Sequence, residues 1–410
     1  LKTKTQNFAT YYIINVSPAL LFIFVASYFI LLLVVAWITG RNSNNESFFI
    51  GNKNSNWMLV AFGMIGTSLS GVTFVSVPGG VGAGHFYYFQ VVLGYLIGYF
   101  VIAFVLIPLY YRLNVTSIYT YLEKRFGVNA HKAGASFFIL SRLVGATARL
   151  YLVISVLQIF IFDRLGIAFE LTAFVILVLI LLYTFEGGVK TIIYTDTLQT
   201  TGMLTGLVVC ILVILKVMDL NFSQALSLMH ENGYTRIFNT DIKSNTFFLK
   251  HLLGGAFIAI AMTGLDQEMM QKNISVPNLR DSQKNMFVFS VVLVLVNLLF
   301  LLLGALLSLY AQSHGLNVAG DQLFPSVVMQ HFPAWVQVIF FIALISALFP
   351  SADGAMTALT SSFCIDILGL KRRTDLTDAA ARRIRQITHV SFALLFFVLA
   401  LAPQLNGGNI

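Results

Sequence analysis

Asp196 is an acid that lies just inside an apolar segment near the middle of the chain, where its type and place have chemical consequences. A charged side chain within an apolar span is costly, and such residues usually serve ion or substrate pathways. Asp196 is only about 8 Å beyond the start of its segment at 1.5 Å per residue, so an interfacial charge is the alternative interpretation. In either place its carboxylate favours a cation as partner.

Asp353 is a second acid of this kind, inside the apolar run 334–366 and shortly after Pro350. One unneutralised carboxylate in such surroundings attracts a cation strongly. The alternative is a structural role, either as a cap for the kink that the proline makes or as a partner of Arg142 or Arg149. The sequence therefore predicts a cation-binding site that involves buried acids.

The overall composition places these acids in a membrane protein. Hydrophobic residues make up 58% of the 410 residues and charged residues only 10%, against roughly 25% charged residues in soluble domains. The net charge of +8 does not indicate nucleic acid as a partner, because the basic residues lie in short loops between apolar runs. Cys210 and Cys364 both lie inside apolar stretches, which argues against a disulfide framework and against a transition-metal cysteine motif.

Ten apolar runs are long enough to cross a bilayer, for which about 20 helical residues are needed. They span residues 18–38, 57–78, 86–111, 133–162, 166–183, 191–218, 246–271, 286–310, 334–366 and 387–403. Lys and Arg number 16 in the loops on one side of these runs and 5 on the other side. Because the richer side is cytoplasmic, we expect a multi-pass protein of the cell inner (plasma) membrane with its N-terminus outside.

Two of the runs are interrupted by glycine at matching places in the chain. The run 57–78 continues into a glycine-rich stretch after Pro78, and the run 246–271 has glycines beside Asp266. Helices unwound at corresponding positions of two halves are typical of the central site of secondary transporters, although glycine also serves close helix packing. We therefore expect two five-helix units of opposite orientation, preceded by an extra leading helix; the units are 57–218 and 246–403, and the leading helix is 18–38.

The segment around Asp196 resembles the fifth core helix of the sodium/solute symporter family, which includes sodium-coupled glucose, proline, pantothenate and sialic acid carriers. The family motif G-G-x-x-x-x-x-x-T-D-x-x-Q is matched by Gly187, Gly188, Thr195, Asp196 and Gln199. The resemblance implies an all-α polytopic membrane protein with the LeuT-type inverted repeat of 5+5 core helices. The second unit shows only four runs, so we expect the last core helix to be missing from this chain.

The resemblance also implies a sodium site between the first and eighth core helices, the latter aligned through Asp366. Its residues are Gly66, Leu69, Ala347, Pro350 and Ser351. Most relatives place a hydroxyl residue where Pro350 stands, but a proline inside a helix frees the carbonyl of Ser346, which can serve as a ligand instead. The sialic acid branch binds a second sodium with the fifth-helix acid, and here Asp353 with Asp196 is the corresponding candidate pair.

A substrate site is implied where the first and sixth core helices break. Residues 67–74, TSLSGVTF, resemble the T-T-L-S-S-I-T-F of the sialic acid carriers more than the A-A-N-I-S-A-E-Q of the sugar carriers. In that branch hydroxyls receive a carboxylate, at positions that correspond to Ser68, Ser70 and Thr73. The branch's substrate arginine falls at Gly145, so Arg142 and Arg149 on the same helix are expected either to replace it or to pair with acids. Further candidates for the pocket are Phe74, Gln90, Asp266 and Gln267.

The function that these features predict is sodium-coupled symport of a small polar solute by alternating access, with sodium and the lipid bilayer as partners and no resident cofactor. A carboxylate such as sialic acid fits the motif best. A sugar or polyol is the alternative, because Asp266 repels a carboxylate unless it is paired. An enzyme is not expected: no histidines are spaced for a metal, and no phosphate loop is present. A transporter-like sensor domain is the alternative from another class, and the oligomeric state stays open.

Overall fold

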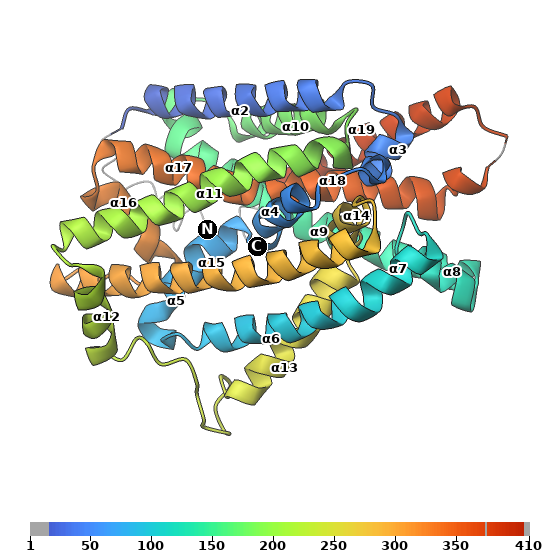
Figure 1. Cartoon of the computed structure of the whole chain (residues 1–410). Coiled ribbons are helices and arrows are strands. Elements are labelled where there is room, and N and C mark those ends of the chain that lie inside the picture. Colours follow the sequence, from blue (N-terminus) through green and yellow to red (C-terminus); the bar gives the residue numbers. More distant parts are fainter. Residues whose placement is uncertain (1–15, 374, 406–410) are drawn as a thin grey trace.

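The computed structural model describes residues 16–373 and 375–405, and within these ranges every regular element is helical (Figure 1). The long helices form a bundle with roughly aligned axes. They are α2 (Pro18–Gly40), α6 (Tyr88–Val101), α9 (Val128–Leu157), α10 (Phe169–Thr184), α11 (Val189–Val217), α15 (Leu279–Ser313), α17 (Ala334–Leu348), α18 (Pro350–Ser362) and α19 (Asp378–Leu405). Short helices connect them: α3 (Asn45–Ile50), α7 (Ile107–Leu113), α8 (Thr120–Phe126), α12 (Phe222–Glu231) and α16 (Leu323–His331).

Both glycine-interrupted runs are broken helices, as the sequence predicts. The first consists of α4 (Trp57–Ser68) and α5 (Gly71–Gly84), which meet at 63°. The second consists of α13 (Phe248–Ala259), which continues through η5 (Ile260–Gly264), and α14 (Gln267–Ile274), at 65°. The side chains of Ser70 and Asp266 cap α5 and α14 by accepting a hydrogen bond from a backbone N–H in the first turn. Each break is therefore stabilised by a capping residue that satisfies exposed backbone donors.

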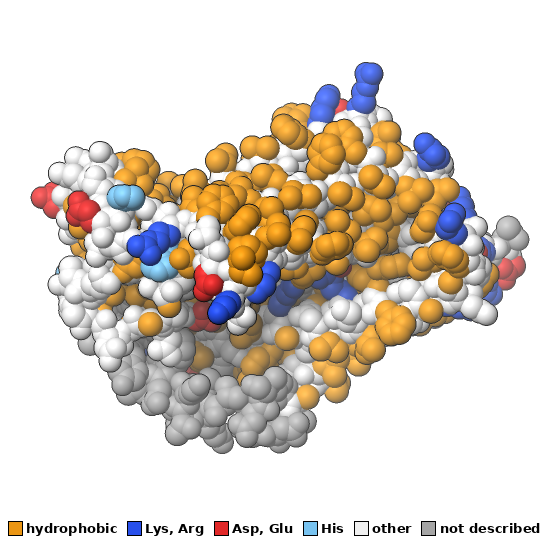
Figure 2. All heavy atoms as spheres, turned by 90° about the horizontal axis from the view of Figure 1, so that it is seen from below, with side chains coloured by type: hydrophobic (Ala, Val, Ile, Leu, Met, Phe, Trp, Pro, Cys, Tyr) orange, Lys and Arg blue, Asp and Glu red, His pale blue; other side chains and the backbone are white. Residues whose placement is uncertain are grey.

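The described part of the chain holds seven helices that are long and apolar enough to cross a membrane, or nine if each broken pair counts as one span. The apolar helix α10 is shorter, and with it each of the ten predicted runs coincides with a helix or a helix pair. Apolar side chains cover a broad part of the face seen in Figure 2, as expected of a surface in contact with lipid.

Small residues let the helices approach closely around the two breaks. Gly94 on α6 and Gly255 on α13 lie so close to the facing backbone that a Cβ at either position would overlap it. Gly206 on α11 faces Ala343 on α17 in the same way. Membrane helices use such small residues because dispersion contacts between close backbones replace the hydrophobic effect. The packing fixes α13 against α6 and α11 against α17, while α4 and α5 of the first broken helix contact α11 and α17 respectively.

Candidate functional site

A cavity of about 200 Å³ lies at the two helix breaks. The side chains that line it come from α4, α5, α6, α9, α13, η5, α14 and α15. Five of them are among the predicted substrate residues: Ser68, Ser70, Thr73, Arg142 and Arg149. The sequence analysis missed others, notably Tyr88, Tyr95, Tyr99, Thr263 and Asn297. The cavity thus combines hydroxyl groups, aromatic rings and two guanidinium groups.

The two arginines differ in what they contact. Nη2 of Arg142 lies 2.8 Å from Oδ1 of Asp266 and 2.7 Å from Oε2 of Glu268, so two carboxylates already neutralise this guanidinium. Arg149 lies two turns further along α9 and also lines the cavity. Within the described ranges no carboxylate oxygen lies within 4.0 Å of its guanidinium nitrogens. Arg149 is therefore the cation that is available to an anionic ligand.

Three other predicted substrate residues lie outside the cavity lining. The ring of Phe74 packs against three other phenylalanine rings of the core, with centroids 5.4 to 5.9 Å apart. The amide of Gln90 binds the backbone carbonyls of Tyr87 and Thr246 at 3.0 and 3.2 Å. The side-chain oxygen of Gln267 accepts a hydrogen bond from the backbone N–H of Ile118 at 2.9 Å, and its NH₂ group donates to a backbone carbonyl of the same loop. All three side chains have packing partners of their own, and their contact with substrate stays a prediction.

Asp266 is a fourth predicted substrate residue that is absent from the cavity lining, but it lies close to the cavity. It does not line the cavity itself, but it lines the adjoining groove between α9 and η5, which also contains Arg142 and Arg149. Its carboxylate pairs with Arg142 and accepts from the backbone N–H of Met269 at 3.0 Å. Because Asp266 is paired, its charge is no reason to exclude a carboxylate from the cavity.

The residues of the implied sodium site lie where the first break meets the junction of α17 and α18. α4 contacts both of these helices, and Leu69, Ala347 and Ser351 are buried. Pro350 begins α18, and its missing N–H leaves the carbonyl of Ser346 without the usual helical donor. Carbonyl and hydroxyl oxygens are the ligands that a hard cation such as sodium prefers, so these groups fit the ion. Gly66 donates its N–H to Oγ1 of Thr200 at 3.1 Å, which anchors α4 to α11 beside this site.

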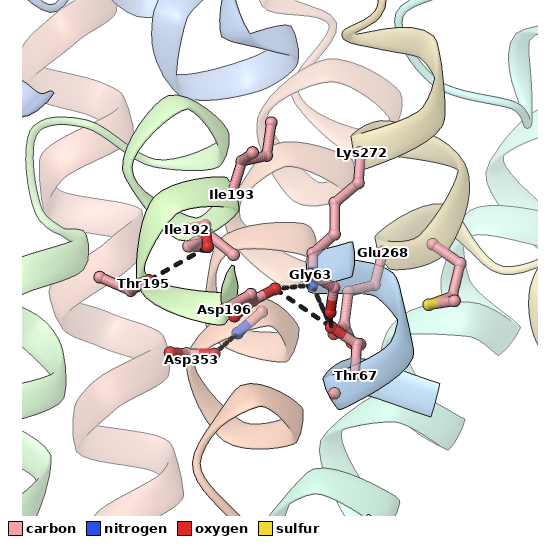
Figure 3. Close-up of polar contacts among 12 residues, drawn as sticks. Gly63, Thr67, Ile192, Ile193, Thr195, Asp196, Glu268, Lys272 and Asp353 are labelled. Carbon is pink, nitrogen blue, oxygen red and sulfur yellow. Dashed lines mark hydrogen bonds and ion pairs between the residues drawn. The ribbon is translucent and has the colours of Figure 1, made fainter. Parts of the chain in front are cut away.

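A cluster of buried charges adjoins the cavity, because Thr67 belongs to both; Figure 3 shows the cluster. Lys272 of α14 places its ammonium group 2.6 Å from Oδ2 of Asp196, 2.7 Å from Oγ1 of Thr67 and 3.6 Å from Oε1 of Glu268. The hydroxyl of Thr67 also donates to Asp196 at 3.1 Å. Lys272 follows the predicted run 246–271 and was expected in a loop, so this cluster was not predicted from the sequence. The signal that was present is the spacing of Glu268 and Lys272, four residues apart on one helix face.

Asp353 is buried next to this cluster and lies near enough to Asp196 for the two carboxylates to repel each other. The hydroxyl of Tyr183 donates to its Oδ2 at 2.7 Å, and the backbone N–H of Gly354 donates to Oδ1 at 2.6 Å. Within the described ranges no Lys, Arg or His nitrogen lies within 4.0 Å of this carboxylate, so the predicted alternative of a bridge to an arginine is not formed. Two hydrogen bonds thus reach this carboxylate, and the binding of a cation by Asp353 stays a prediction.

The chain matches the sodium:solute symporter family over residues 48–409. It is similar to the sodium/sialic acid symporter NanT of Aliivibrio fischeri, with 24% identity over 376 residues that cover 86% of this chain and 70% of the relative. Similarity to the sodium/sialic acid symporter SiaT of Proteus mirabilis is 22% over 377 residues, with 86% and 71% covered. The human sodium-coupled monocarboxylate transporter 1 is 24% identical over 394 residues, with 91% and 62% covered.

A solved structure has the same fold. It is the substrate-bound outward-open state of a sodium-coupled sialic acid symporter, with a TM-score of 0.84 and 18% identity over 94% of this chain and 82% of that one. The match confirms the predicted fold class, an all-α membrane protein of the LeuT type. The division into two five-helix units and the absence of a tenth core helix stay predictions.

Proposed function

Because the chain belongs to the sodium:solute symporter family, and is therefore a sodium-coupled multi-pass membrane transporter rather than an enzyme, we propose that its solute is a small carboxylate that binds in the cavity at the two helix breaks. The observation that carries this proposal is Arg149, a cavity-lining guanidinium without a carboxylate partner in the described part of the chain. An uncompensated cation in a partly buried site favours an anionic ligand.

The groups around Arg149 suit the same ligand. Ser70 and Thr73 lie at the start of α5, where free backbone N–H groups and the positive end of the helix dipole attract an anion. Three tyrosines of α6 supply apolar surface and hydroxyl donors for the rest of the solute. Two of the relatives named above carry sialic acid and a third carries monocarboxylates, according to their names. The sugar or polyol alternative loses its main support, because Asp266 is paired with Arg142.

The coupling ion in this proposal binds next to the cavity. Carbonyl oxygens of Gly66 and Leu69 on one side, and Ala347, Ser351 and the carbonyl freed by Pro350 on the other, provide the ligands. Sodium at this place orders the break between α4 and α5, which also presents Ser70 to the solute. The ion therefore raises the affinity for the solute, and the solute raises the affinity for the ion by the same factor. Asp353 is the acid that we propose for a further cation.

Orientation and location complete the proposal. The excess of Lys and Arg on one side favours a cytoplasmic place for that side and an outside N-terminus, in the inner (plasma) membrane. Alternating access then opens the cavity first to one side of the bilayer and then to the other, with the broken helices as the moving elements.

The test is binding of defined solutes to the purified protein, measured by thermal shift in sodium and in potassium at equal ionic strength. We expect sialic acid or a monocarboxylate to raise the unfolding temperature in sodium only, while galactose, inositol and proline do not. Stabilisation by galactose or inositol alone would contradict the carboxylate. Equal stabilisation in potassium would contradict the sodium site. Uptake into proteoliposomes against a gradient separates a transporter from a sensor, which would bind without flux.

A further inference from the structure

We propose that Lys272 is a built-in cation: its ammonium group occupies the place beside Asp196 where a free sodium ion would otherwise bind. The proposal rests on the proposed function, since it concerns the ions of a sodium-coupled cycle. It replaces the sequence-based hypothesis that Asp196 is itself a sodium ligand, and it leaves Asp353 as the acid that needs a mobile cation.

The surroundings of the ammonium group are those of a bound cation. Nζ of Lys272 has a carboxylate oxygen of Asp196 at 2.6 Å, the hydroxyl oxygen of Thr67 at 2.7 Å and a carboxylate oxygen of Glu268 at 3.6 Å. All four residues are buried. These oxygens come from α4, α11 and α14. The ammonium therefore connects α4 and α14, one half of each broken helix, with α11, which carries the family motif (Figure 3). Sodium would require the same kind of oxygen ligands.

Two glycines bring the neighbouring helices against this ion pair. A Cβ at Gly63 would lie 3.1 Å from Cβ of Asp196, and a Cβ at Gly354 would lie 3.2 Å from Nζ of Lys272 and would overlap Glu268. α4 and α18 therefore pack directly on the pair from different sides. In such a close-packed place the ammonium and a free ion compete for the same oxygens of Asp196.

The two oxygens of the Asp196 carboxylate differ in their hydrogen-bond partners among the described residues. Oδ1 of Asp196 is buried and has no hydrogen-bond partner, while Oδ2 receives both Lys272 and Thr67. Without the lysine the hydroxyl of Thr67 would still donate to Oδ2, but the carboxylate would lose its counter-charge, which is strongly unfavourable for a buried acid. Glu268 would keep its pair with Arg142. Removal of the ammonium thus creates a vacancy at Asp196 in particular.

The experiment counts bound sodium. Radiolabelled sodium is bound to the purified full chain at constant ionic strength, with choline as the replacing cation, for the wild type and for Lys272→Met. We expect Lys272→Met to bind one more sodium ion per chain than the wild type, and the added substitution Asp196→Asn to return the number to that of the wild type. Lys284→Met is the matched control, because this exposed lysine pairs at 3.1 Å with Asp281, a carboxylate that is itself partly exposed. An equal number in Lys272→Met and the wild type would overturn the proposal.

A second measurement decides the question if Lys272→Met does not fold. Asp196→Asn alone removes one acid and leaves Lys272 with Glu268. We expect it to bind as many sodium ions as the wild type, with a half-saturating concentration within twofold, because the proposal excludes Asp196 from the sodium ligands. Loss of one ion in Asp196→Asn would show that Asp196 binds sodium beside the lysine and would refute the idea. A wild type without any bound sodium would count against the proposed function. The comparison of Lys272→Met with the wild type would still test the role of Lys272, because it depends only on a difference of one ion.

Discussion

Replacing Arg149 with alanine is expected to weaken the binding of a carboxylate solute by about 10- to 150-fold. A hydrogen bond to a charged group contributes about 1.5–3 kcal/mol, and each 1.4 kcal/mol corresponds to tenfold in affinity. Stability should change little, because no described carboxylate lies within 4.0 Å of this guanidinium and none is left unpaired by its removal. The loss therefore reports on the solute rather than on folding.

The assay is titration of the purified variant with sialic acid in saturating sodium, read by thermal shift and by isothermal calorimetry. Arg149→Lys keeps the charge but not the planar pair of donors, so we expect it to lose less affinity than Arg149→Ala. Gly145→Arg, which restores the arginine at the position of the sialic acid branch, is a gain-of-function control, since nothing lies within 4 Å of a Cβ at Gly145. An Arg149→Ala protein with unchanged affinity for the carboxylate would refute the assignment of Arg149 to the substrate.

Three further predictions concern the helices around the cavity. Gly66→Ala places a methyl group onto the facing hydroxyl of α11 and should cost about 1–3 kcal/mol of stability, whereas Gly254→Ala, with no atom within 4 Å, should be neutral in the same thermal unfolding assay. Arg142→Ala removes the ion-pair partner of Asp266 and leaves Glu268 with its 3.6 Å contact to Lys272. It should destabilise the fold by about 3–5 kcal/mol, with partial rescue by Asp266→Asn; an unchanged unfolding temperature would contradict the ion pairs. Ser351→Ala removes one hydroxyl and should raise the half-saturating sodium concentration roughly fivefold, for about 1 kcal/mol, as measured by sodium-dependent thermal shift; an unaltered value would remove Ser351 from the sodium site.

The spans and the two helix breaks were predictable because their signals are local. A run of about 20 apolar residues has to cross the bilayer as a helix, since no water is present to satisfy an unpaired backbone. A serine or aspartate within a few residues of a glycine provides the cap that lets a new helix start, as Ser70 and Asp266 do. Neither signal depends on which helices are neighbours in space.

The partners of the charged residues depend on those neighbours and were not predictable. Arg142 and Arg149 stand on one helix and were equivalent candidates in the sequence, but only Arg142 lies within reach of the acids of α14. Phe74, predicted for the pocket, packs in a cluster of phenylalanine rings, which its sequence position does not indicate. Tyr88 was missed because an aromatic residue in an apolar run carries no signal of its own, although it lines the cavity. Side-chain direction decides each case, and it is set by helix rotation.

The bend in the second broken helix decides the surroundings of Lys272. In a straight continuation of α13 this residue would belong to the loops that are rich in Lys and Arg, where a lysine is an ordinary topological signal. The 65° bend turns α14 into the bundle and buries the ammonium among oxygens of α4 and α11. The charges then alternate from Arg142 through Glu268 and Lys272 to Asp196, with contacts of 2.7, 3.6 and 2.6 Å. Breaking one pair alone would leave a buried charge without a partner, which is strongly unfavourable. We therefore expect that any movement of α14 relative to α9 and α11 requires these groups to exchange partners together, which would link Arg142 to the acid of the family motif.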